Sequence, residues 1–355
     1  MNSNKKRIIF DAERMKYPHT GLYHYCHQLG NAIQHHIDND SEEIFFYVRE
    51  SERKSFGENG HYINQHSFHK FWMPSMRSFK IWHANYQATQ YFPKRSNLKI
   101  VLTVHDLNFL HEQKEEYKIE REIKKLQHKI NNTDHIIAIS EFTANDIKKH
   151  IDIRDTPLSV IHNGCNLNNI KTLNIPTSVP SNKFLFTIGT ITQKKNFHVL
   201  PALLEKNNLE LIIAGITSNE EYKEKIIEEA KKIGVENRVV FTGAITENDK
   251  QWYLQNCEAF LFPSLAEGFG LPVIEAMQYG VPVILSKSTA LPEIGGEDAY
   301  YFSNFNSVSM QNDLVEFLND YKNNPEKKDK IIKRSKMFDW NSVAKKYLEV
   351  YRSFY

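Results

Sequence analysis

Short apolar runs alternate along the chain with longer segments in which apolar residues recur every three or four positions. A short run bounded by turn-forming residues predicts a buried strand, and the longer period predicts an amphipathic helix. The predicted strands lie at residues 7–10, 43–48, 100–104, 135–139, 184–188, 209–214, 239–242, 259–262 and 281–285. The predicted helices lie at residues 23–36, 117–129, 198–205, 220–233, 247–255, 273–278, 312–321 and 341–351. This alternation predicts an α/β fold built from parallel βαβ units.

A segment without sustained periodicity separates two α/β halves. It covers residues 168–182 and contains Pro176, Pro180 and several Asn and Ser residues, a composition typical of a linker. A chain of 355 residues has room for two domains, so we expect one on each side of this segment. In doubly wound sheets ligands bind outside the carboxyl ends of the strands, which predicts a site in the cleft between the two halves.

The composition excludes several classes of protein. With 41% hydrophobic and 25% charged residues, the chain is neither disordered nor a disulfide scaffold. Its 45 Lys and Arg against 43 Asp and Glu leave a net charge of +2, which argues against a nucleic-acid binder. No G-x-G-x-x-G follows the first predicted strand, which disfavours a dinucleotide-dependent dehydrogenase.

The cysteines and the apolar segments indicate where the protein works. Cys26, Cys165 and Cys257 are odd in number and far apart, so they predict no zinc site and favour a reducing cytoplasm. The basic N-terminus has only the apolar run 8–10 before Asp11, too short for a signal peptide. No segment approaches the roughly 20 apolar residues of a membrane span. We therefore expect any membrane contact to be peripheral, at the inner face of the cytoplasmic membrane.

The near-neutral net charge conceals a stretch, residues 59–105, that has no acidic residue. Its basic residues are Lys70, Arg77, Lys80, Lys94, Arg95 and Lys99. Its aromatic residues are Tyr62, Phe68, Phe71, Trp72, Phe79, Trp82, Tyr86, Tyr91 and Phe92. One interpretation is a solvated basic face over a partly aromatic core. The other is a surface for an anionic partner, either a phosphate-bearing acceptor or an anionic membrane.

The junction that follows the strand at 259–262 carries the most chemical information. Its loop contains Gly268 and Gly270, and Pro272 suits the first position of the next helix. The unpaired N–H groups and the positive dipole end of such a helix favour an anion or a hydroxyl-rich ligand. Glycines in the loop let that ligand approach the backbone closely.

Two glutamates belong to the same junction, Glu267 in the loop and Glu275 in the first helical turn. An ionised carboxylate is a pure acceptor, so each can hold a pair of sugar hydroxyls. Alternatively, Glu275 complements the helix N-terminus and Glu267 is solvated. A glycosidase acid and nucleophile is a third interpretation, which depends on the spatial separation of the two carboxylates.

The segment EGFGLPVIEAM, with its E-x7-E spacing from Glu267 to Glu275, resembles the signature of the retaining GT-B glycosyltransferases of family 4. Further segments are similar to that family, and the likeness extends from about residue 8 to residue 351. They are FLFTIGTITQKKN at 184–196, TVHDL at 103–107, TGLY at 20–23, ISEF at 139–142, VIHNG at 160–164, ALPEI at 290–294 and DW at 339–340.

The resemblance implies the GT-B architecture, in which two Rossmann-like domains with doubly wound parallel sheets face each other across a cleft. The acceptor-binding domain would cover residues 1–170 and the nucleotide-sugar-binding domain residues 180–336. The last segment, residues 337–355, would be a helix that crosses back to the N-terminal domain.

The resemblance also implies roles for residues of the donor site. Glu275 would hold the nucleotide ribose, Glu267 the donor sugar hydroxyls and Lys195 the diphosphate, whose charge a lysine can stabilise. The implied donor-binding set is Gly21, Gly189, Thr190, Lys194, Lys195, Glu267, Gly268, Phe269, Gly270, Leu271 and Glu275. Lys194 occupies a position at which many relatives carry arginine. Thr190 occupies a position at which some relatives carry arginine. Without the family, Lys194 and Lys195 are typical of a surface charge pair at a helix start.

The implied catalytic residues are His105, Glu267 and Lys195, with His105 near the reacting carbon of the donor sugar. The implied acceptor-binding residues are Tyr23, His83 and Asp106. From the residues alone, His83 fits a core histidine equally well, and Asp106 fits a residue that fixes the turn after a strand. We expect no metal and no cofactor, and front-face substitution in which the departing phosphate helps to deprotonate the acceptor.

The function implied is transfer of a hexose from a nucleotide-sugar donor to a saccharide or polyprenyl-diphosphate-linked saccharide, in bacterial surface glycan biosynthesis. The segments ITQKKN and HDL resemble those of relatives that use GDP-mannose, which favours mannose as the transferred sugar. A UDP-sugar fits the same motifs. The alternatives are a nucleotide-sugar epimerase of the same fold and a catalytically silent nucleotide-sugar or glycan-binding protein.

Overall fold

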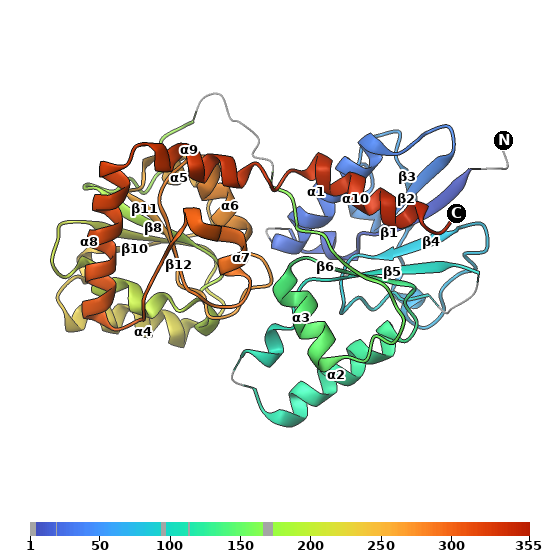
Figure 1. Ribbon diagram of the computed structural model, residues 1–355, viewed down its shortest axis with the longest axis horizontal. Coiled ribbons are helices and arrows are strands. Elements are labelled where there is room, and N and C mark those ends of the chain that lie inside the picture. Colours follow the sequence, from blue (N-terminus) through green and yellow to red (C-terminus); the bar gives the residue numbers. More distant parts are fainter. Residues whose placement is uncertain (1–4, 19, 94–96, 113, 166–172) are drawn as a thin grey trace. The chain divides into compact units, whose positions relative to one another are not determined.

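The computed structural model describes residues 5–18, 20–93, 97–112, 114–165 and 173–355 (Figure 1). The chain forms two compact units. Unit 1 comprises Met1–Gly164 together with Phe338–Tyr355, and unit 2 comprises Cys165–Met337. Lys94, Arg95 and residues 168–172 of the expected linker lie outside the described residues.

Unit 1 contains a parallel sheet in the order β3-β2-β1-β4-β5-β6-β7. Its strands are β1 Lys6–Asp11, β2 Glu42–Val48, β3 His61–Asn64, β4 Ile81–Ala84, β5 Lys99–Val104, β6 His135–Ala138 and β7 Leu158–Val160. Its α-helices are α1 Gly21–His36, α2 Glu116–Ile130, α3 Glu141–His150 and α10 Trp340–Arg352.

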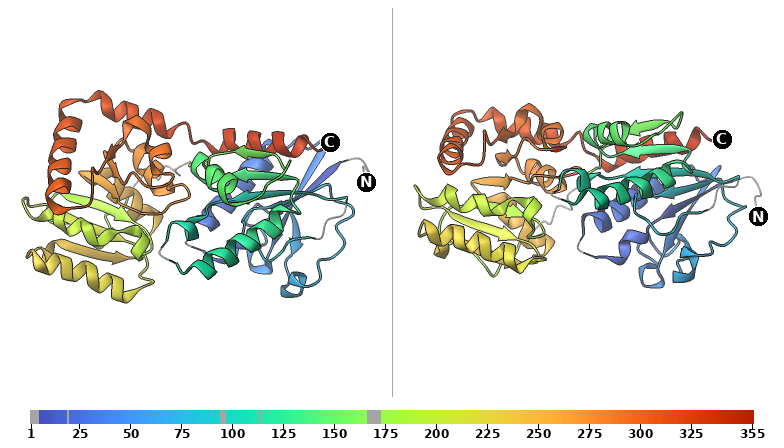
Figure 2. Two further views of the ribbon diagram at one scale, coloured as in Figure 1. Left: turned by 60° about the horizontal axis from the view of Figure 1, so that its bottom comes forward. Right: turned by 90° about the horizontal axis from the view of Figure 1, so that it is seen from below.

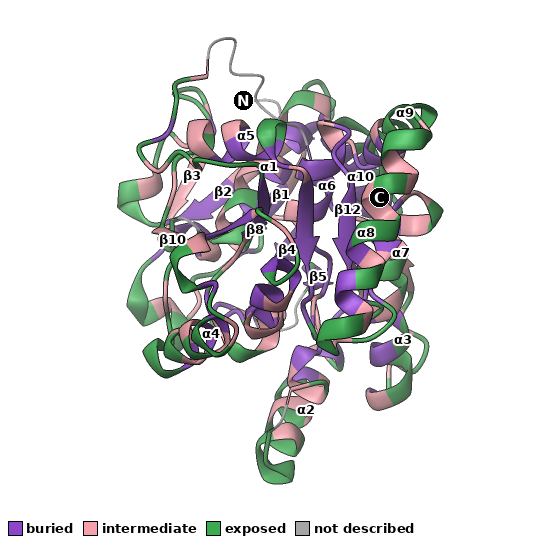
Figure 3. Cartoon of the chain, turned by 90° about the vertical axis from the view of Figure 1, so that its left-hand side faces the viewer, coloured by how far each residue is buried: buried purple, intermediate pink, exposed green. Residues whose placement is uncertain are grey.

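Helices cover both faces of the sheet in unit 1, because alternate strand residues point to opposite sides. On β1, Ile8 and Phe10 belong to the apolar cluster that includes residues of α1 and α10. Ile9, between them, belongs to the cluster that includes residues of α2 and α3. The central strand β4 is accordingly buried along its length, whereas the edge strand β3 is exposed or half-buried (Figure 3).

The C-terminal helix α10 completes the core of unit 1. The Asp339 side chain caps it by accepting from the Ser342 N–H at 2.8 Å. Its residues Val343, Tyr347 and Tyr351 recur at helical spacing and are buried against α1 and the sheet. The last segment of the chain therefore folds as part of unit 1.

Unit 2 contains a second parallel sheet in the order β10-β9-β8-β11-β12-β13. Its strands are β8 Phe184–Ile188, β9 Glu210–Ala214, β10 Val239–Gly243, β11 Ala259–Phe262, β12 Val283–Leu285 and β13 Tyr300–Tyr301. Its α-helices are α4 Glu220–Lys232, α5 Glu247–Asn256, α6 Leu271–Gln278, α7 Leu291–Gly295, α8 Ser307–Asn323 and α9 Glu326–Ser335. In this unit α4 covers one face of the sheet, and α9 lies over the other face against α6 (Figure 2).

The predicted strands are confirmed, with shifts of one or two residues at their ends. Strands β3, β4, β7 and β13 are absent from the predicted set. A polar residue interrupts the apolar run in each of β3, β4 and β7, and β13 has only two residues. Helices α3, α7 and α9 are also absent from it. The predicted helix at 198–205 is the 3-10 helix η6, Phe197–Leu204, which contains Pro201 and so lacks one backbone donor.

Each sheet has one point where the strand order reverses. In unit 1 it lies between β1 and β4, and in unit 2 between β8 and β11. Ligands of doubly wound sheets bind at the carboxyl ends of the strands beside such a point. We therefore expect the site residues of each unit to lie beside that unit's own switch point.

Candidate active site

The loops that follow β8 and β11 lie together at the switch point of unit 2. The Leu265 N–H donates to the Lys194 carbonyl at 2.8 Å, which ties the loop after β11 to the 3-10 helix η5, Gln193–Lys195. This contact brings the predicted phosphate loop and the predicted sugar loop to one edge of the sheet.

Lys195 and Glu267 form an ion pair across these loops. The Lys195 Nζ lies 2.6 Å from the Glu267 Oε1, and both side chains are largely buried. The same ammonium lies 4.6 Å from the centre of the Phe262 ring at the end of β11. The Glu267 backbone N–H donates to the Thr289 hydroxyl at 2.9 Å, which anchors the loop. The predicted diphosphate lysine and sugar glutamate thus occupy one small region.

Gly189 gives Lys195 room to reach that position. A Cβ at Gly189 would lie 3.0 Å from the Lys195 Cε and 3.3 Å from its Nζ. Such contacts would displace the ammonium, so a side chain here would disturb the pair. The neighbouring Thr190 is exposed, and Lys194 is half-buried.

Glu275 lies in the second turn of α6, which corrects the expected first turn. The helix begins at Leu271, so Pro272 is its second residue and its first turn has no acidic residue. Glu275 therefore does not complement the helix N-terminus. Its Oε1 instead lies 2.7 Å from the Lys250 Nζ of α5. Burial raises the pKa of Glu275, and the charge of Lys250 opposes that rise.

The remaining predicted donor residues line the turn that enters α6. Gly270 is the N-cap of the helix with a left-handed backbone of φ 105°, which favours glycine. Gly268 and Phe269 before it are buried, and Leu271 after it is half-buried. The turn therefore leaves backbone groups, with few side chains, beside the two glutamates.

In unit 1, His105 follows β5 near the switch point of the first sheet. Its Nε2 donates to the Asn85 carbonyl at 2.8 Å, and its backbone N–H donates to the Gln87 Oε1 at 3.0 Å. Because the carbonyl only accepts, Nδ1 is the acceptor nitrogen of the neutral ring. Burial lowers the pKa of His105 to about 4, so the ring is neutral at pH 7. A neutral histidine can accept a hydroxyl proton in a hydrogen bond.

His83 lies in the core of unit 1 with no exposed surface. Its Nε2 lies 2.8 Å from the Thr103 hydroxyl and its Nδ1 2.6 Å from the Tyr351 hydroxyl of α10. Burial lowers its pKa to about 3. Both ring nitrogens are engaged within the protein, as expected for a core histidine, and its acceptor role stays a prediction.

The other predicted residues of unit 1 lie at its loop ends. The Asp106 Oδ1 accepts from the Asn108 N–H at 3.0 Å and so fixes the turn after His105. Gly21 begins α1 in an exposed position, and a Cβ there would meet no atom of the described residues within 4 Å. Tyr23, two residues later, is half-buried, and its ring stacks on His27 at 6.1 Å. The structure gives no packing reason for glycine at position 21.

Buried acidic groups at the carboxyl end of β1 were missed in the sequence. The Asp11 Oδ2 accepts from the Thr89 hydroxyl at 2.9 Å, and its Oδ1 accepts from the Glu13 N–H at 3.0 Å. Burial, together with the nearby charge of Glu13, raises the pKa of Asp11 to about 8. Asp11 is therefore largely protonated at pH 7. Its place after a strand was a signal that sequence reasoning could have used.

Lys250 was also missed, although its pattern was visible. It lies three and four residues before Tyr253 and Leu254, on the face of α5 that the helical period buries. A lysine on an apolar face indicates a buried charge partner, which here is Glu275.

The acid-free stretch presents aromatic side chains to solvent. Phe68, Phe71 and Trp72 are 63%, 86% and 70% exposed, around the 3-10 helix η3 of Ser67–Lys70. Lys70 lies between them. Trp82, from the same stretch, is fully buried. The stretch therefore contributes both to the core and to an exposed aromatic surface.

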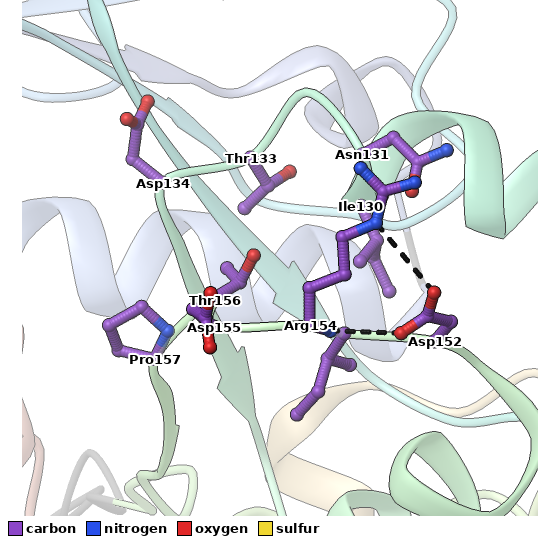
Figure 4. A pocket seen from close by; sticks show the side chains of 10 residues that line it. Ile130, Asn131, Thr133, Asp134, Asp152, Arg154, Asp155, Thr156 and Pro157 are labelled. Atoms are coloured by element: carbon purple, nitrogen blue, oxygen red, sulfur yellow. Dashed lines mark hydrogen bonds and ion pairs between the residues drawn. The ribbon is translucent and has the colours of Figure 1, made fainter.

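A hollow of about 310 Å³ lies at the opposite edge of the unit 1 sheet, before β6 and β7 (Figure 4). Its lining residues are Ile130, Asn131, Thr133, Asp134, Asp152, Ile153, Arg154, Asp155, Thr156 and Pro157. Arg154 pairs with Asp152 there at 3.7 Å. It is separate from the carboxyl ends of the strands, and no predicted site residue lines it.

The described residues contain neither a membrane-spanning helix nor a cluster of metal-ligating side chains. No helix there is long and apolar enough to cross a membrane. No group of three or more His, Cys, Asp or Glu is placed to hold a metal ion in the same part of the chain.

Both halves of the chain match known family models. Residues 171–338 match the model described as Glycosyl transferases group 1, and residues 24–169 match the model described as Glycosyltransferase Family 4.

The relatives include bacterial transferases. Serotype-specific mannosyltransferase WbdA from Escherichia coli is 28% identical over 228 residues, 59% of this chain and 28% of that protein. The chain thus spans little more than a quarter of the length of WbdA. O-antigen chain mannosyltransferase B from Escherichia coli is 22% identical, over 98% of this chain and 99% of that protein. N-acetylgalactosamine-N,N'-diacetylbacillosaminyl-diphospho-undecaprenol 4-alpha-N-acetylgalactosaminyltransferase from Campylobacter jejuni is 25% identical, over 61% of this chain and 59% of that protein.

Solved structures share the fold. Sucrose-phosphate synthase from Thermosynechococcus elongatus has a TM-score of 0.74 at 17% identity, covering 98% of this chain and 99% of that one. Anabaena Alr3699/HepE, in complex with UDP and glucose, has a TM-score of 0.72 at 16% identity, covering 98% of this chain and 100% of that one. This likeness confirms the predicted GT-B fold class.

Proposed function

Since the chain belongs to the glycosyltransferases of group 1 and family 4, we propose that it is a retaining enzyme that transfers a hexose from a nucleotide-sugar donor. The observation that carries this proposal is the pairing of Lys195 with Glu267 and of Lys250 with Glu275 at the switch point of unit 2. Two carboxylates beside two ammonium groups suit a ligand that has both hydroxyls and phosphates.

In this proposal each group meets one part of the donor. The diphosphate binds the Lys195 ammonium. This positive charge stabilises the negative charge that develops on the leaving group. Glu267, released from that lysine, accepts hydrogen bonds from the sugar hydroxyls. Glu275 accepts from the ribose hydroxyls while it stays paired with Lys250.

His105 positions the donor sugar as a neutral acceptor. Its Nδ1 would receive a sugar hydroxyl near the reacting carbon, while Nε2 stays bonded to the Asn85 carbonyl. Departure of the phosphate and attack of the acceptor on the same face would retain the anomeric configuration. The acceptor proton would pass to the departing phosphate oxygen.

We further propose mannose from GDP-mannose as the donor and a lipid-linked saccharide as the acceptor. The first choice is supported by the mannosyltransferases among the relatives. The second is supported by the Campylobacter relative, whose name describes an undecaprenol diphosphate-linked substrate. Both assignments place the enzyme in the synthesis of a bacterial surface glycan.

A thermal-shift panel of GDP, UDP, CDP and ADP tests the donor site. A nucleotide at about 100 times its Kd stabilises the folded state by about 2.7 kcal/mol, so one member should raise the Tm clearly. Glu275→Gln should remove most of the shift, and Glu316→Gln on the exposed side of α8 should keep it. No shift with any of the four would refute the proposal.

The anomeric configuration of the product tests retention. With GDP-α-mannose and a synthetic lipid-linked acceptor, NMR should find an α linkage in the product. A β linkage would contradict a retaining reaction, and isolation of a glycosyl-enzyme adduct would contradict front-face substitution.

We also propose that the exposed aromatic surface of Phe68, Phe71 and Trp72 meets an anionic membrane. Aromatic rings favour the headgroup depth, and Lys70, Arg77 and Lys80 supply positive charge near anionic lipids. This placement would bring the enzyme to a lipid-linked acceptor.

Flotation with vesicles that contain phosphatidylglycerol tests the contact. Phe71→Ser with Trp72→Ser should weaken binding, as should Lys70, Arg77 and Lys80 changed together to Glu. Val308→Ser with Val315→Ser, which removes exposed apolar groups from α8, should bind as the wild type does. Equal binding by all of these proteins would contradict the proposal.

A further inference from the structure

Lys250 occupies an unusual place for a lysine. It lies in α5 with its side chain only 11% exposed, and its Nζ is 2.7 Å from the Oε1 of both Glu247 and Glu275. Glu247 is one helical turn away and 54% exposed, whereas Glu275 belongs to α6 and is 18% exposed. The ammonium therefore links a solvent-facing carboxylate to a buried one.

Fold stability alone does not explain this arrangement. Removing charges from water costs several kcal/mol for each ion, and apolar residues of similar volume in place of a buried ion pair are often neutral or stabilising. The face of α5 that carries Lys250 also carries the buried Tyr253 and Leu254, so an apolar side chain would suit it. The charge at this position points to a use in the site.

The geometry leaves one oxygen of Glu275 for a ligand. Lys250 holds Oε1, and among the described residues no hydrogen bond to Oε2 is found. Burial favours the protonated form of this carboxyl, and the adjacent ammonium opposes that effect. An ionised carboxylate only accepts hydrogen bonds, so the oxygen requires hydroxyl donors.

We propose that Lys250 is the positioning residue that makes the donor site select a ribose, because it holds one oxygen of Glu275 and keeps the other turned toward the sugar hydroxyls. The inference rests on the proposed function, since Glu275 must be the ribose ligand. A nucleotide without the 2′ and 3′ hydroxyls would leave a buried charged acceptor unpaired, and that penalty provides the selectivity.

Binding of paired nucleotides tests the inference. Isothermal titration compares GDP with 2′,3′-dideoxy-GDP, and UDP with 2′,3′-dideoxy-UDP, on wild type, Lys250→Met, Glu275→Gln and the double variant. The wild type should prefer the ribonucleotide by about 10- to 100-fold, the range of a hydrogen bond to a charged group. Lys250→Met should lose most of this preference, and the double variant should lose no more than Glu275→Gln alone.

Further variants separate positioning from a general structural defect. Lys250→Arg keeps the charge and should restore part of the preference, whereas Lys250→Gln should not. Lys231→Met, which changes an exposed lysine of α4, should leave the preference unchanged. If Lys250→Met does not fold, the comparison of the Arg and Gln variants decides the same question.

The two proposals fail in different ways. A wild-type protein that binds neither GDP nor UDP refutes the proposed donor site. A wild type that binds a ribonucleotide selectively, with the same selectivity in Lys250→Met or Lys250→Gln, overturns the inference about Lys250 and leaves the donor site intact.

Discussion

The two units have parallel doubly wound sheets, but the titratable groups described above at their switch points differ in charge. In unit 2, Lys195 pairs with Glu267 and Lys250 with Glu275, so charged groups are kept beside the sheet. In unit 1, burial lowers the pKa of His105 to about 4 and raises that of Asp11 to about 8. Both of these groups are largely neutral at pH 7.

This difference in charge follows from the ion-pair and hydrogen-bond partners that neighbouring loops and strands supply to each side chain. A lysine has a long stem that reaches a carboxylate on a neighbouring loop, as Lys195 reaches Glu267. His105 instead bonds to the Asn85 carbonyl, which does not repay the cost of burying a positive ring. One fold can thus place paired charges suited to a diphosphate in unit 2 and a neutral histidine suited to hydroxyl groups in unit 1, where the buried pair of Lys16 with Glu13 is the charged exception.

Removing the Lys195 charge should have the largest effect. Lys195→Ala should reduce kcat by about 10²- to 10³-fold, the range for loss of one group that stabilises transition-state charge. Glu267→Gln should give a loss of similar order, and the double variant less than the product of the two, because the residues act as a pair. Steady-state transfer to a lipid-linked acceptor measures these values.

The exposed Lys231→Ala of α4 is the matched control and should keep wild-type rates. Equal activity of Lys195→Ala and the wild type would show that the diphosphate is held elsewhere.

Changing His105 should have the next largest effect, at about 10²-fold in kcat for His105→Ala, a typical loss for a positioned side chain. Since its pKa is about 4, His105 stays neutral above pH 5, so its titration should not shape the rate between pH 6 and 8. The profile of kcat against pH measures this. The exposed His128→Gln of α2 serves as control, and an acid limb near pH 6.5 that His105→Gln removes would contradict a neutral role.

The sequence predicts the sheets well because their strands are buried on both faces and read as apolar runs. Phe184–Ile188 and Ala259–Phe262 match the predicted bounds, and both lead into the loops of the proposed donor site. Strand β4, Ile81–Ala84, is absent from the strands predicted from apolar runs because a fully buried histidine interrupts its run. Its burial depends on Tyr351, more than 260 residues later in the chain.

The residues of the proposed donor site follow from the resemblance to the family motif, but their pairing could not be predicted from it. Lys195 and Glu267 are 72 residues apart, and Lys250 and Glu275 are 25 apart. Only the order of strands, which brings β8 next to β11, places the first two together. To predict the contact between Lys250 and Glu275, one would need to know both which face of α5 is buried and that α6 starts at Leu271.

Unit 1 should become less stable as the pH rises, because of Asp11. Between about pH 4 and pH 8 the carboxyl is ionised in the unfolded chain and protonated in the folded one, so the folded state binds more protons. The stability that this group contributes is complete below pH 4 and is lost as the pH approaches 8, with a slope of up to about 1.4 kcal/mol per pH unit. Asp11→Asn should flatten this part of the profile.

Urea unfolding between pH 4.5 and 8 measures the effect, and Asp298→Asn in unit 2 is the control. Identical slopes for Asp11→Asn and the wild type would show that Asp11 is ionised in the folded protein.

The smallest expected effect distinguishes Lys194 from Lys195 in the proposed donor loop. Lys194 is half-buried and holds the loop through its backbone carbonyl, so its side chain is not required for the contact with Leu265. Lys194→Ala should therefore raise the KM for the donor only a few-fold, in the range of a partly exposed charge interaction. Lys194→Arg should lower the KM by a similar factor, because a guanidinium can hold two phosphate oxygens at once. If Lys194→Ala instead matches Lys195→Ala in kcat, the charge of unit 2 acts through both lysines, and the ion pair with Glu267 is not what distinguishes the donor site.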